Sequence, residues 1–309
     1  MTVDLLSDAL AVADARSVFS GGFTAGGDWA IQLRGRDRLK VNAVVQGGCL
    51  LVRDDGGEPL RLTEGDVVIS DGGQPYTLCS RPGVAPTDSG DVVMDPETRM
   101  GRLGQGEAVD VACVSGHIDL SRDRGDLLRR ALPELVHVRA DSPEAGVLRW
   151  LIGQLAAEMR TRRAGVEFVS AQLAQLMFVQ VLRVCLTDAD GLPPGWLRAL
   201  ADDRLAPALR LMHGDPAHPW QLEELARAAA MSRTTFAVRF KEAAGVPPLT
   251  YLLNWRMNLA ARALRQDKAP VGALARSVGY TSESAFSNAF KRAVGVAPRR
   301  YREEALARS

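Results

Sequence analysis

Cysteine and histidine are scarce in this chain, which has four of each among 309 residues. The cysteines lie far apart without a CxxC pair, at Cys49, Cys79, Cys113 and Cys185. This spacing favours a reducing compartment over a disulfide scaffold, so we expect a cytoplasmic protein. Cys113 is either a redox-sensing thiol or a buried structural cysteine. The second is preferred because no Lys, Arg or His directly flanks it to lower its pKa.

Long apolar runs and catalytic motifs are also missing. No run of 18 apolar residues occurs, so no transmembrane helix is expected. The N-terminus, "MTVDLLSDAL", is acidic and unlike a signal peptide. We find no Ser/His/Asp spacing, no P-loop and no paired acids in a motif. The sequence therefore predicts a non-membrane protein that is not an enzyme and needs no cofactor.

Charge is divided unevenly along the chain. The net charge is +1, but residues 196–309 carry 18 Lys and Arg against 10 Asp and Glu. That region has a charge of +8 and the remainder a charge of −7. A basic region of this size is typical of nucleic-acid binding, although a solvated basic surface is the alternative.

One sequence device occurs twice in the basic region. "FKEAAGVPPLTY" (240–251) and "FKRAVGVAPRRY" (290–301) share seven residue identities at the same spacing. Each copy follows a short apolar helical pattern and a break. Ser232 and Ser282 are predicted N-caps of a second helix, and Gly245 and Gly295 its C-caps. The pattern predicts two helix-turn-helix units, at 222–244 and 271–294. We call these units the first head and the second head, and the second helix of each its reading helix.

The exposed face of each reading helix follows from the buried phenylalanines at 100° per residue. Small, polar or basic side chains on such a face can approach base edges while Lys meets phosphate. We expect DNA contacts from Arg233, Thr234, Ala237, Val238, Lys241, Ser284, Ser287, Asn288 and Lys291. The apolar stripe from Leu249 to Ala263 predicts a connecting helix of roughly 25–29 Å. Such a rod could hold the two heads about one DNA turn apart.

These residues resemble a known family. Residues 198–304 look like the tandem helix-turn-helix domain of AraC/XylS-family transcriptional regulators. "LARSVGYTSESAFSNAFKRAVGVAPRRYR" closely matches the family's C-terminal signature. The resemblance implies base reading by Thr234, Ala237 and Val238 in the first head, and by Ser284, Ser287 and Asn288 in the second. Position 238 is often Arg in that family but Val here, so the first head is expected to read thymine methyl groups or DNA shape.

The N-terminal half shows a period of two. Short apolar strands from Trp29 to about His117 are separated by Gly-rich turns, which predicts a small barrel or sandwich. "LTEGDVVISDGGQPYTL" resembles cupin-like sensor domains. A cupin can also be a metal-dependent enzyme, and that alternative needs clustered histidines. Tyr76 and Asn42 stand where relatives often have His, so no metal site is expected. Trp29, Asn42, Cys49 and Tyr76 are candidates for lining a ligand cavity, or alternatively for core packing.

Residues 143–187 return to helical periodicity with apolar surface on more than one face. Such a hairpin suits either a dimer interface or a seat for the barrel. The family resemblance implies the dimer interface, with Leu176 and Phe178 predicted in it. "TDADGLPPGW" reads as a linker.

The predicted fold class is α+β, with a cupin-like barrel and helical hairpin followed by an all-α tandem helix-turn-helix domain. The predicted domains are 1–140 (barrel), 141–187 (hairpin), 188–196 (linker) and 197–309 (DNA-binding). We expect a homodimeric, sequence-specific transcriptional regulator of promoter DNA that responds to an unknown small molecule. A ligand-independent DNA binder whose barrel only dimerises is the other alternative. The resemblance implies RNA polymerase as a partner, and activation is the expected mode.

Overall fold

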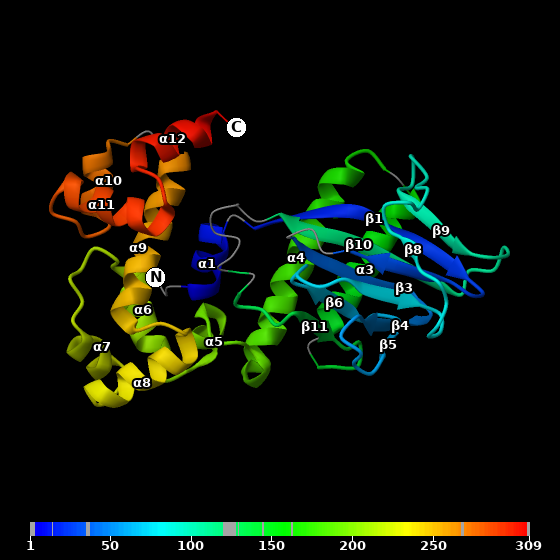
Figure 1. The fold of residues 1–309 in the computed structure, drawn as a ribbon, viewed down its shortest axis with the longest axis horizontal. Helices are drawn as coiled ribbons and strands as arrows, with labels where there is room; N and C mark the ends of the chain where they lie inside the picture. Colours follow the sequence, from blue (N-terminus) through cyan, green and yellow to red (C-terminus); the bar gives the residue numbers. More distant parts are fainter. Residues whose placement is uncertain are drawn as a thin grey trace. The chain divides into compact units, whose positions relative to one another are not determined.

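Two compact units make up the chain in the computed structural model (Figure 1). The structure describes residues 4–13, 15–34, 38–119, 128, 130–143, 145–161, 163–266 and 269–307. A β unit comprises residues 15–120 and 132–191. A helical unit comprises residues 1–14, 121–131 and 192–309.

The β unit contains two stacked sheets, with the orders β11-β6-β3-β10-β1-β9 and β5-β4-β7-β2-β8. Its strands are β1 (Arg16–Gly26), β2 (Ala30–Leu33), β3 (Leu39–Gln46), β4 (Gly48–Arg53), β5 (Leu60–Thr63), β6 (Val67–Ser70), β7 (Tyr76–Cys79), β8 (Thr87–Asp88), β9 (Met100–Gly104), β10 (Val111–Asp119) and β11 (Leu135–Val138). Neighbouring strands are antiparallel except β1 with β9 and β2 with β8. The predicted β-rich cupin-like domain is confirmed, but the sheets are mixed and do not close into a barrel.

The core of the β unit lies between the sheets. Phe23 and Val44 come from the six-stranded sheet, and Leu51 and Leu78 from the five-stranded sheet. All four are at most 3% exposed. The alternation that was read from the sequence therefore places one side of each strand in a shared apolar layer.

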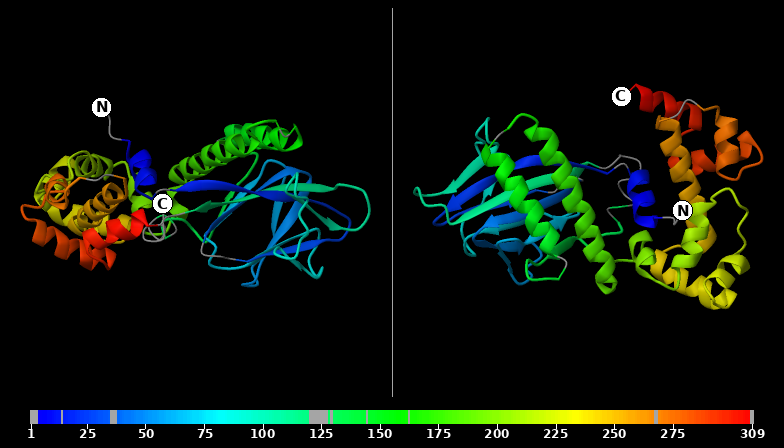
Figure 2. Two further views of the ribbon diagram at one scale, coloured as in Figure 1. Left: turned by 90° about the horizontal axis from the view of Figure 1, so that it is seen from above. Right: turned by 180° about the vertical axis from the view of Figure 1, so that it is seen from behind.

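Two helices, α3 (Ala145–Thr161) and α4 (Val166–Thr187), cover one face of the six-stranded sheet (Figure 2). Gly165 makes the turn between them with φ 87°, a conformation that glycine adopts without strain. Among the described residues α4 is the one helix with the length and hydropathy of a membrane span. Met177, Phe178 and Val181 on α4 are buried, as expected for a helix that packs on a sheet.

The helical unit begins with α1 (Leu5–Ala13) and continues after the β unit. Its later helices are α5 (Trp196–Ala201), α6 (Ala206–Gly214), α7 (Leu222–Ala228), α8 (Arg233–Ala244), α9 (Pro248–Gln266), α10 (Val271–Ser277), α11 (Glu283–Val294) and α12 (Pro298–Leu306). Helix α1 packs on α6 and α9, which buries Ala9, Val12 and Ala13. The predicted division placed residues 1–140 together, whereas residues 1–14 group with the helices because of this packing.

Both heads contain the same aromatic core. Phe236 and Phe240 are fully buried in the first head, and Phe286 and Phe290 in the second. In the first head the ring of Phe240 lies edge-on to Tyr251, with centroids 5.4 Å apart and an interplanar angle of 78°. In the second head Phe290 lies edge-on to Tyr301, at 5.5 Å and 74°. The repeated Phe and Tyr of the twelve-residue device are thus the two ends of one packing contact.

Candidate nucleic-acid interface

The reading helices α8 and α11 begin and end in the same way. Ser232 Oγ accepts a hydrogen bond from the backbone N–H of Thr235 at 3.2 Å, and Ser282 Oγ accepts one from Ala285 at 3.1 Å. Gly245 and Gly295 end the helices with φ 74° and 91°. The predicted N-caps and C-caps are therefore confirmed, and both reading helices have the same length, 12 residues.

The nine residues predicted to contact DNA lie on the faces of α8 and α11 that are turned away from the core. Ala237 and Ser287 are half-buried, and the other seven are exposed: Arg233, Thr234, Val238, Lys241, Ser284, Asn288 and Lys291. Val238 is 53% exposed, which is unusual for a large apolar side chain. Each head thus brings its predicted contact residues onto one face, whereas their contacts with bases or phosphates stay predictions.

The first reading helix is tied to α5 by a charged pair. Arg239 Nε donates to Asp202 Oδ2 at 2.6 Å, and its NH2 group donates to Oδ1 at 3.1 Å. The hydrogen bond to Asp202 raises the pKa of Arg239, so the guanidinium stays charged. This two-point pairing fixes the helix and occupies the guanidinium, so we assign Arg239 to positioning the helix and not to phosphate contact.

The second reading helix carries a residue that the sequence analysis missed. Glu283 is the first residue of α11, where the first head has Arg233. Its Oε1 accepts a hydrogen bond from Arg299 NH2 at 3.2 Å. A carboxylate there stabilises the positive end of the helix dipole, but it also repels phosphate. Aligning the two copies with the 50-residue offset would have found this difference.

Helix α9 connects the heads and is anchored along its length. Nineteen residues give it a length of about 28 Å. Arg256 Nε donates to the Pro216 carbonyl at 2.6 Å, and its NH2 group donates to the His218 carbonyl at 2.7 Å. Burial lowers the pKa of Arg256, and these carbonyls compensate for its lost hydration. The connection between α6 and α7 is thereby fixed to the rod that separates the heads.

The four predicted ligand-lining residues of the β unit, Trp29, Asn42, Cys49 and Tyr76, are buried, each at most 5% exposed. Asn42 Nδ2 donates to the Tyr76 hydroxyl, and Ser115 Oγ donates to Asn42 Oδ1 at 2.6 Å. Burial raises the pKa of Tyr76, so its hydroxyl stays protonated. These two hydrogen bonds satisfy the buried amide of Asn42. Trp29, Cys49 and Tyr76 belong to the apolar core between the sheets. A ligand role for the four stays a prediction.

Cys113 is also in that core and is 1% exposed. A hydrogen bond with Cys49 is the main cause that raises the pKa of the Cys113 thiol, and burial raises it further. A protonated, enclosed thiol is a weak nucleophile, which fits the structural alternative for this residue.

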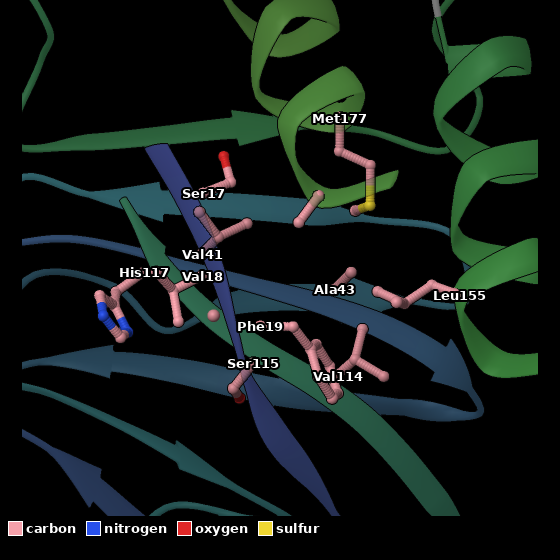
Figure 3. Close-up of a pocket in the computed structure, with 12 residues that line it drawn as sticks. Ser17, Val18, Phe19, Val41, Ala43, Val114, Ser115, His117, Leu155 and Met177 are labelled. Atoms are coloured by element: carbon pink, nitrogen blue, oxygen red, sulfur yellow. The ribbon is translucent and has the colours of Figure 1, made fainter. Parts of the chain in front are cut away.

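A small cavity of about 30 Å³ lies between the six-stranded sheet and the hairpin (Figure 3). Phe19, Val41 and Val114 line it from the strands, and Leu155 and Met177 line it from the helices. A cavity of this size holds about two water molecules and is too small for a metabolite. Among the described residues no group of three His, Cys, Asp or Glu side chains is placed to hold a metal ion.

Helix α9 joins two helix-turn-helix units whose second helices have the same length and the same caps, and each unit has an exposed contact face. This arrangement defines a protein of the DNA-binding class. Models of two protein families match the chain: "Cupin" over residues 4–187 and "Helix-turn-helix domain" over residues 225–304. A putative AraC-like transcription regulator of Streptomyces antibioticus is 42% identical over 98% of this chain and 100% of its own length. One from Streptomyces lividans is 41% identical over 97% of this chain and 98% of its own length. The chain therefore belongs to the family of AraC-like transcription regulators.

Among solved structures, the DNA-binding domain of AdpA in complex with a target DNA is 32% identical. It covers 35% of this chain and 96% of that chain, with a TM-score of 0.33. The resemblance that was read from the C-terminal signature is confirmed by the family match.

Proposed function

We propose that this regulator binds a bipartite promoter site by placing α8 and α11 in successive major grooves of one duplex. The observation that carries the proposal is the duplicated head: the same caps and the same Phe–Tyr core present an exposed contact face twice on one rod. Basic side chains of both heads, Lys241 and Lys291, occupy equivalent exposed positions for phosphate contact.

The test is fluorescence anisotropy of the full-length protein with duplex DNA from its own promoter region and with a scrambled duplex of equal composition. We expect tighter binding to the promoter duplex and an affinity that falls steeply with salt, because Lys and Arg contacts release counterions. Equal affinity for both duplexes, or binding that salt does not weaken, would contradict the proposal.

The hairpin is proposed as the homodimer interface. Trp150, Phe168 and Leu176 are 60%, 71% and 50% exposed on α3 and α4, which is unusual for such large apolar side chains. Phe178, which the sequence analysis placed in the interface, is 1% exposed and packs inside the β unit. Its replacement would disturb the core and would report nothing about association.

Sedimentation velocity at micromolar concentration tests the interface with Phe168→Glu combined with Leu176→Glu. We expect a dimer for the wild type and a monomer for the double variant, because two buried charges without partners oppose association. Glu158→Gln on α3 serves as the control. A monomeric wild type, or a variant that remains dimeric, would contradict this interface.

The β unit is proposed to bind a small-molecule effector and to perform no catalysis. Cytoplasmic location and contact with RNA polymerase at the promoter belong to the same proposal and are supported by the family. A thermal-shift screen against metabolites distinguishes effector sensing from ligand-independent binding, because only a ligand that binds the folded state raises the melting temperature. Stoichiometric transition metal in the purified protein would instead favour the metal-enzyme alternative.

A further inference from the structure

The helical unit contains a large pocket of its own, with a volume of about 550 Å³. All of its described lining residues belong to that unit. Tyr251, Asn254 and Trp255 of α9 form one wall, Gly245 ends α8 beside it, and Ala293 lies near the end of α11. The pocket thus adjoins both reading helices at their C-terminal ends. A volume of this size is in the range of sites for drug-sized ligands.

This pocket is separate from the predicted DNA-contact face. The predicted contact residues lie along the exposed faces of α8 and α11, and none of the nine lines the pocket. An occupant could therefore be present while both heads are on DNA. It would contact the end of each reading helix and the rod between them.

The lining chemistry indicates a class of ligand. Two indole rings, Trp196 and Trp255, and the phenol ring of Tyr251 provide flat apolar surface. Asn254 is exposed and offers an amide that can both donate and accept. No carboxylate is found among the described residues that line the pocket, and the one guanidinium there, Arg130, already has an interaction partner. Apart from Arg130, whose guanidinium is not free, the described lining residues are uncharged, which favours a neutral ligand.

Trp255 forms a firm part of the pocket wall. Its ring stacks on His213, with centroids 3.8 Å apart, and is 5% exposed. Burial lowers the pKa of His213 to about 3, so the stacked imidazole is neutral at physiological pH. The Trp255 Nε1–H has no accessible surface, so the hydrogen-bonding group that meets an occupant is the exposed amide of Asn254, which favours a ligand with oxygen acceptors.

We propose that this pocket binds a neutral planar aromatic molecule carrying carbonyl or hydroxyl oxygens, and that the bound molecule fixes the spacing of the two heads. The binding site itself does not depend on the proposed function. The effect on head spacing rests on that function, because it requires that both heads contact one duplex.

Nile red, a neutral planar dye with a carbonyl oxygen, tests the site by fluorescence titration of the full-length protein. We expect saturable binding of one dye per chain. Ala293→Trp, at an exposed position on the pocket wall, should weaken binding at least tenfold by filling the space. Asn254→Leu should weaken it about fivefold by removing one hydrogen-bonding group. Circular dichroism melting identifies any variant that fails to fold. If Ala293→Trp does not fold, the dye affinity of Asn254→Leu tests the site.

Val93→Ser is the control, because it removes an exposed apolar side chain from the β unit and not from the pocket. Dye binding that is unchanged by both pocket variants, or that is abolished by Val93→Ser, would overturn the site. Tighter binding of an anionic dye, anilinonaphthalene sulfonate, with the same sensitivity to the pocket variants would overturn the neutral class.

The effect on spacing is measured with duplexes whose two half-sites are moved apart or together by one base pair. We expect bound dye to increase the affinity difference between the natural and altered spacings by several-fold in the wild type and not in Ala293→Trp. An unchanged spacing preference at saturating dye would overturn this part. Failure of the dye-free protein to bind any promoter duplex would instead count against the proposed function and would leave the dye titration valid.

Discussion

At the start of its reading helix the first head has Arg233, and the second head has Glu283. Deeper in the same helices the two heads share one contact, since the second phenylalanine of each lies edge-on to a tyrosine, whereas Phe286 of the second head also contacts Tyr280. The tyrosines then differ again in their polar partners. Tyr251 bonds His213 Nε2 at 2.9 Å, whereas Tyr301 accepts from Arg265 NH1 at 3.3 Å. The comparison shows that the two heads share a packed centre. They differ in the charge at the start of the reading helix and in the side chain that hydrogen-bonds the tyrosine, a histidine in one head and an arginine in the other.

The equality of the two cores can be tested by truncation. Phe240→Ala and Phe290→Ala each remove a fully buried ring, and each is expected to cost about 3–5 kcal/mol. Native-state hydrogen exchange of the full-length protein should show the loss in the amides of the altered head. The corresponding Phe→Leu variants are the milder controls. A large loss for one truncation and a negligible loss for the other would contradict equal cores.

Acid should affect the first head more than the second. The pKa of His213 is lowered to about 3 by burial, from an ordinary value of 6.5. The unfolded chain therefore takes up this proton below about pH 6.5 while the folded chain does not, so stability is lost as the pH falls from 6.5 toward 3. Between pH 7 and pH 4 the expected loss is about 2–3 kcal/mol.

Hydrogen exchange at both pH values, with His213→Phe as the comparison, measures this effect. The variant keeps an aromatic ring on Trp255 but has no proton to bind, so the acid sensitivity of the first head should largely disappear. Equal acid sensitivity in the wild type and the variant would show that other groups cause it.

Base discrimination should be stronger in the second head than in the first. Asn288 is exposed on α11 and can form two hydrogen bonds with one adenine, whereas Val238 offers only apolar contact. Asn288→Ala is expected to cost about 1–3 kcal/mol of discrimination at one base pair, and Val238→Ala less than that. Selection of sites from random duplexes measures both. Val238→Arg should add affinity and a preference for guanine. An unchanged preference for Asn288→Ala beside a large loss for Val238→Ala would reverse the ranking.

The smallest expected effect concerns Glu283. Replacing it by Gln removes a negative charge from the start of α11, so DNA affinity should rise by about 0.3–1 kcal/mol at low salt, and less at high salt. Glu304→Gln is the matched control, because Glu304 also pairs with an arginine, Arg300, at 2.8 Å but lies on α12. If both variants raise the affinity equally, the gain reflects net charge and not the position of Glu283.

Much of the helical unit could be predicted because its signals are local. Ser232 and Gly245 determine the ends of α8 through contacts within one turn, and their positions follow from the sequence alone. The open, mixed sheets could not be predicted in the same way. The order of strands depends on pairings between distant segments, such as β1 with β9, which the two-residue period does not encode.

The site was predicted unevenly for the same reason. The contact faces of α8 and α11 follow from helical periodicity, whereas the partner of a surface charge does not. Nothing near Arg239 in the sequence indicates Asp202, 37 residues away, as the group that binds it. The packing of α1 on α6 and α9 was missed because amphipathicity identifies an apolar face but not the surface that covers it.

Helix α9 also has a kinetic consequence. If both heads bind one duplex, as proposed, the helix that joins them keeps a released head close to its own half-site while the other head remains bound. Rebinding is then an intramolecular event, with an effective concentration set by the rod and not by the amount of protein in the cell. Full dissociation requires both heads to be free at once. The residence time on a promoter therefore depends on the affinities of both heads for their half-sites. Weakening either head shortens that residence time far more than it slows the first encounter.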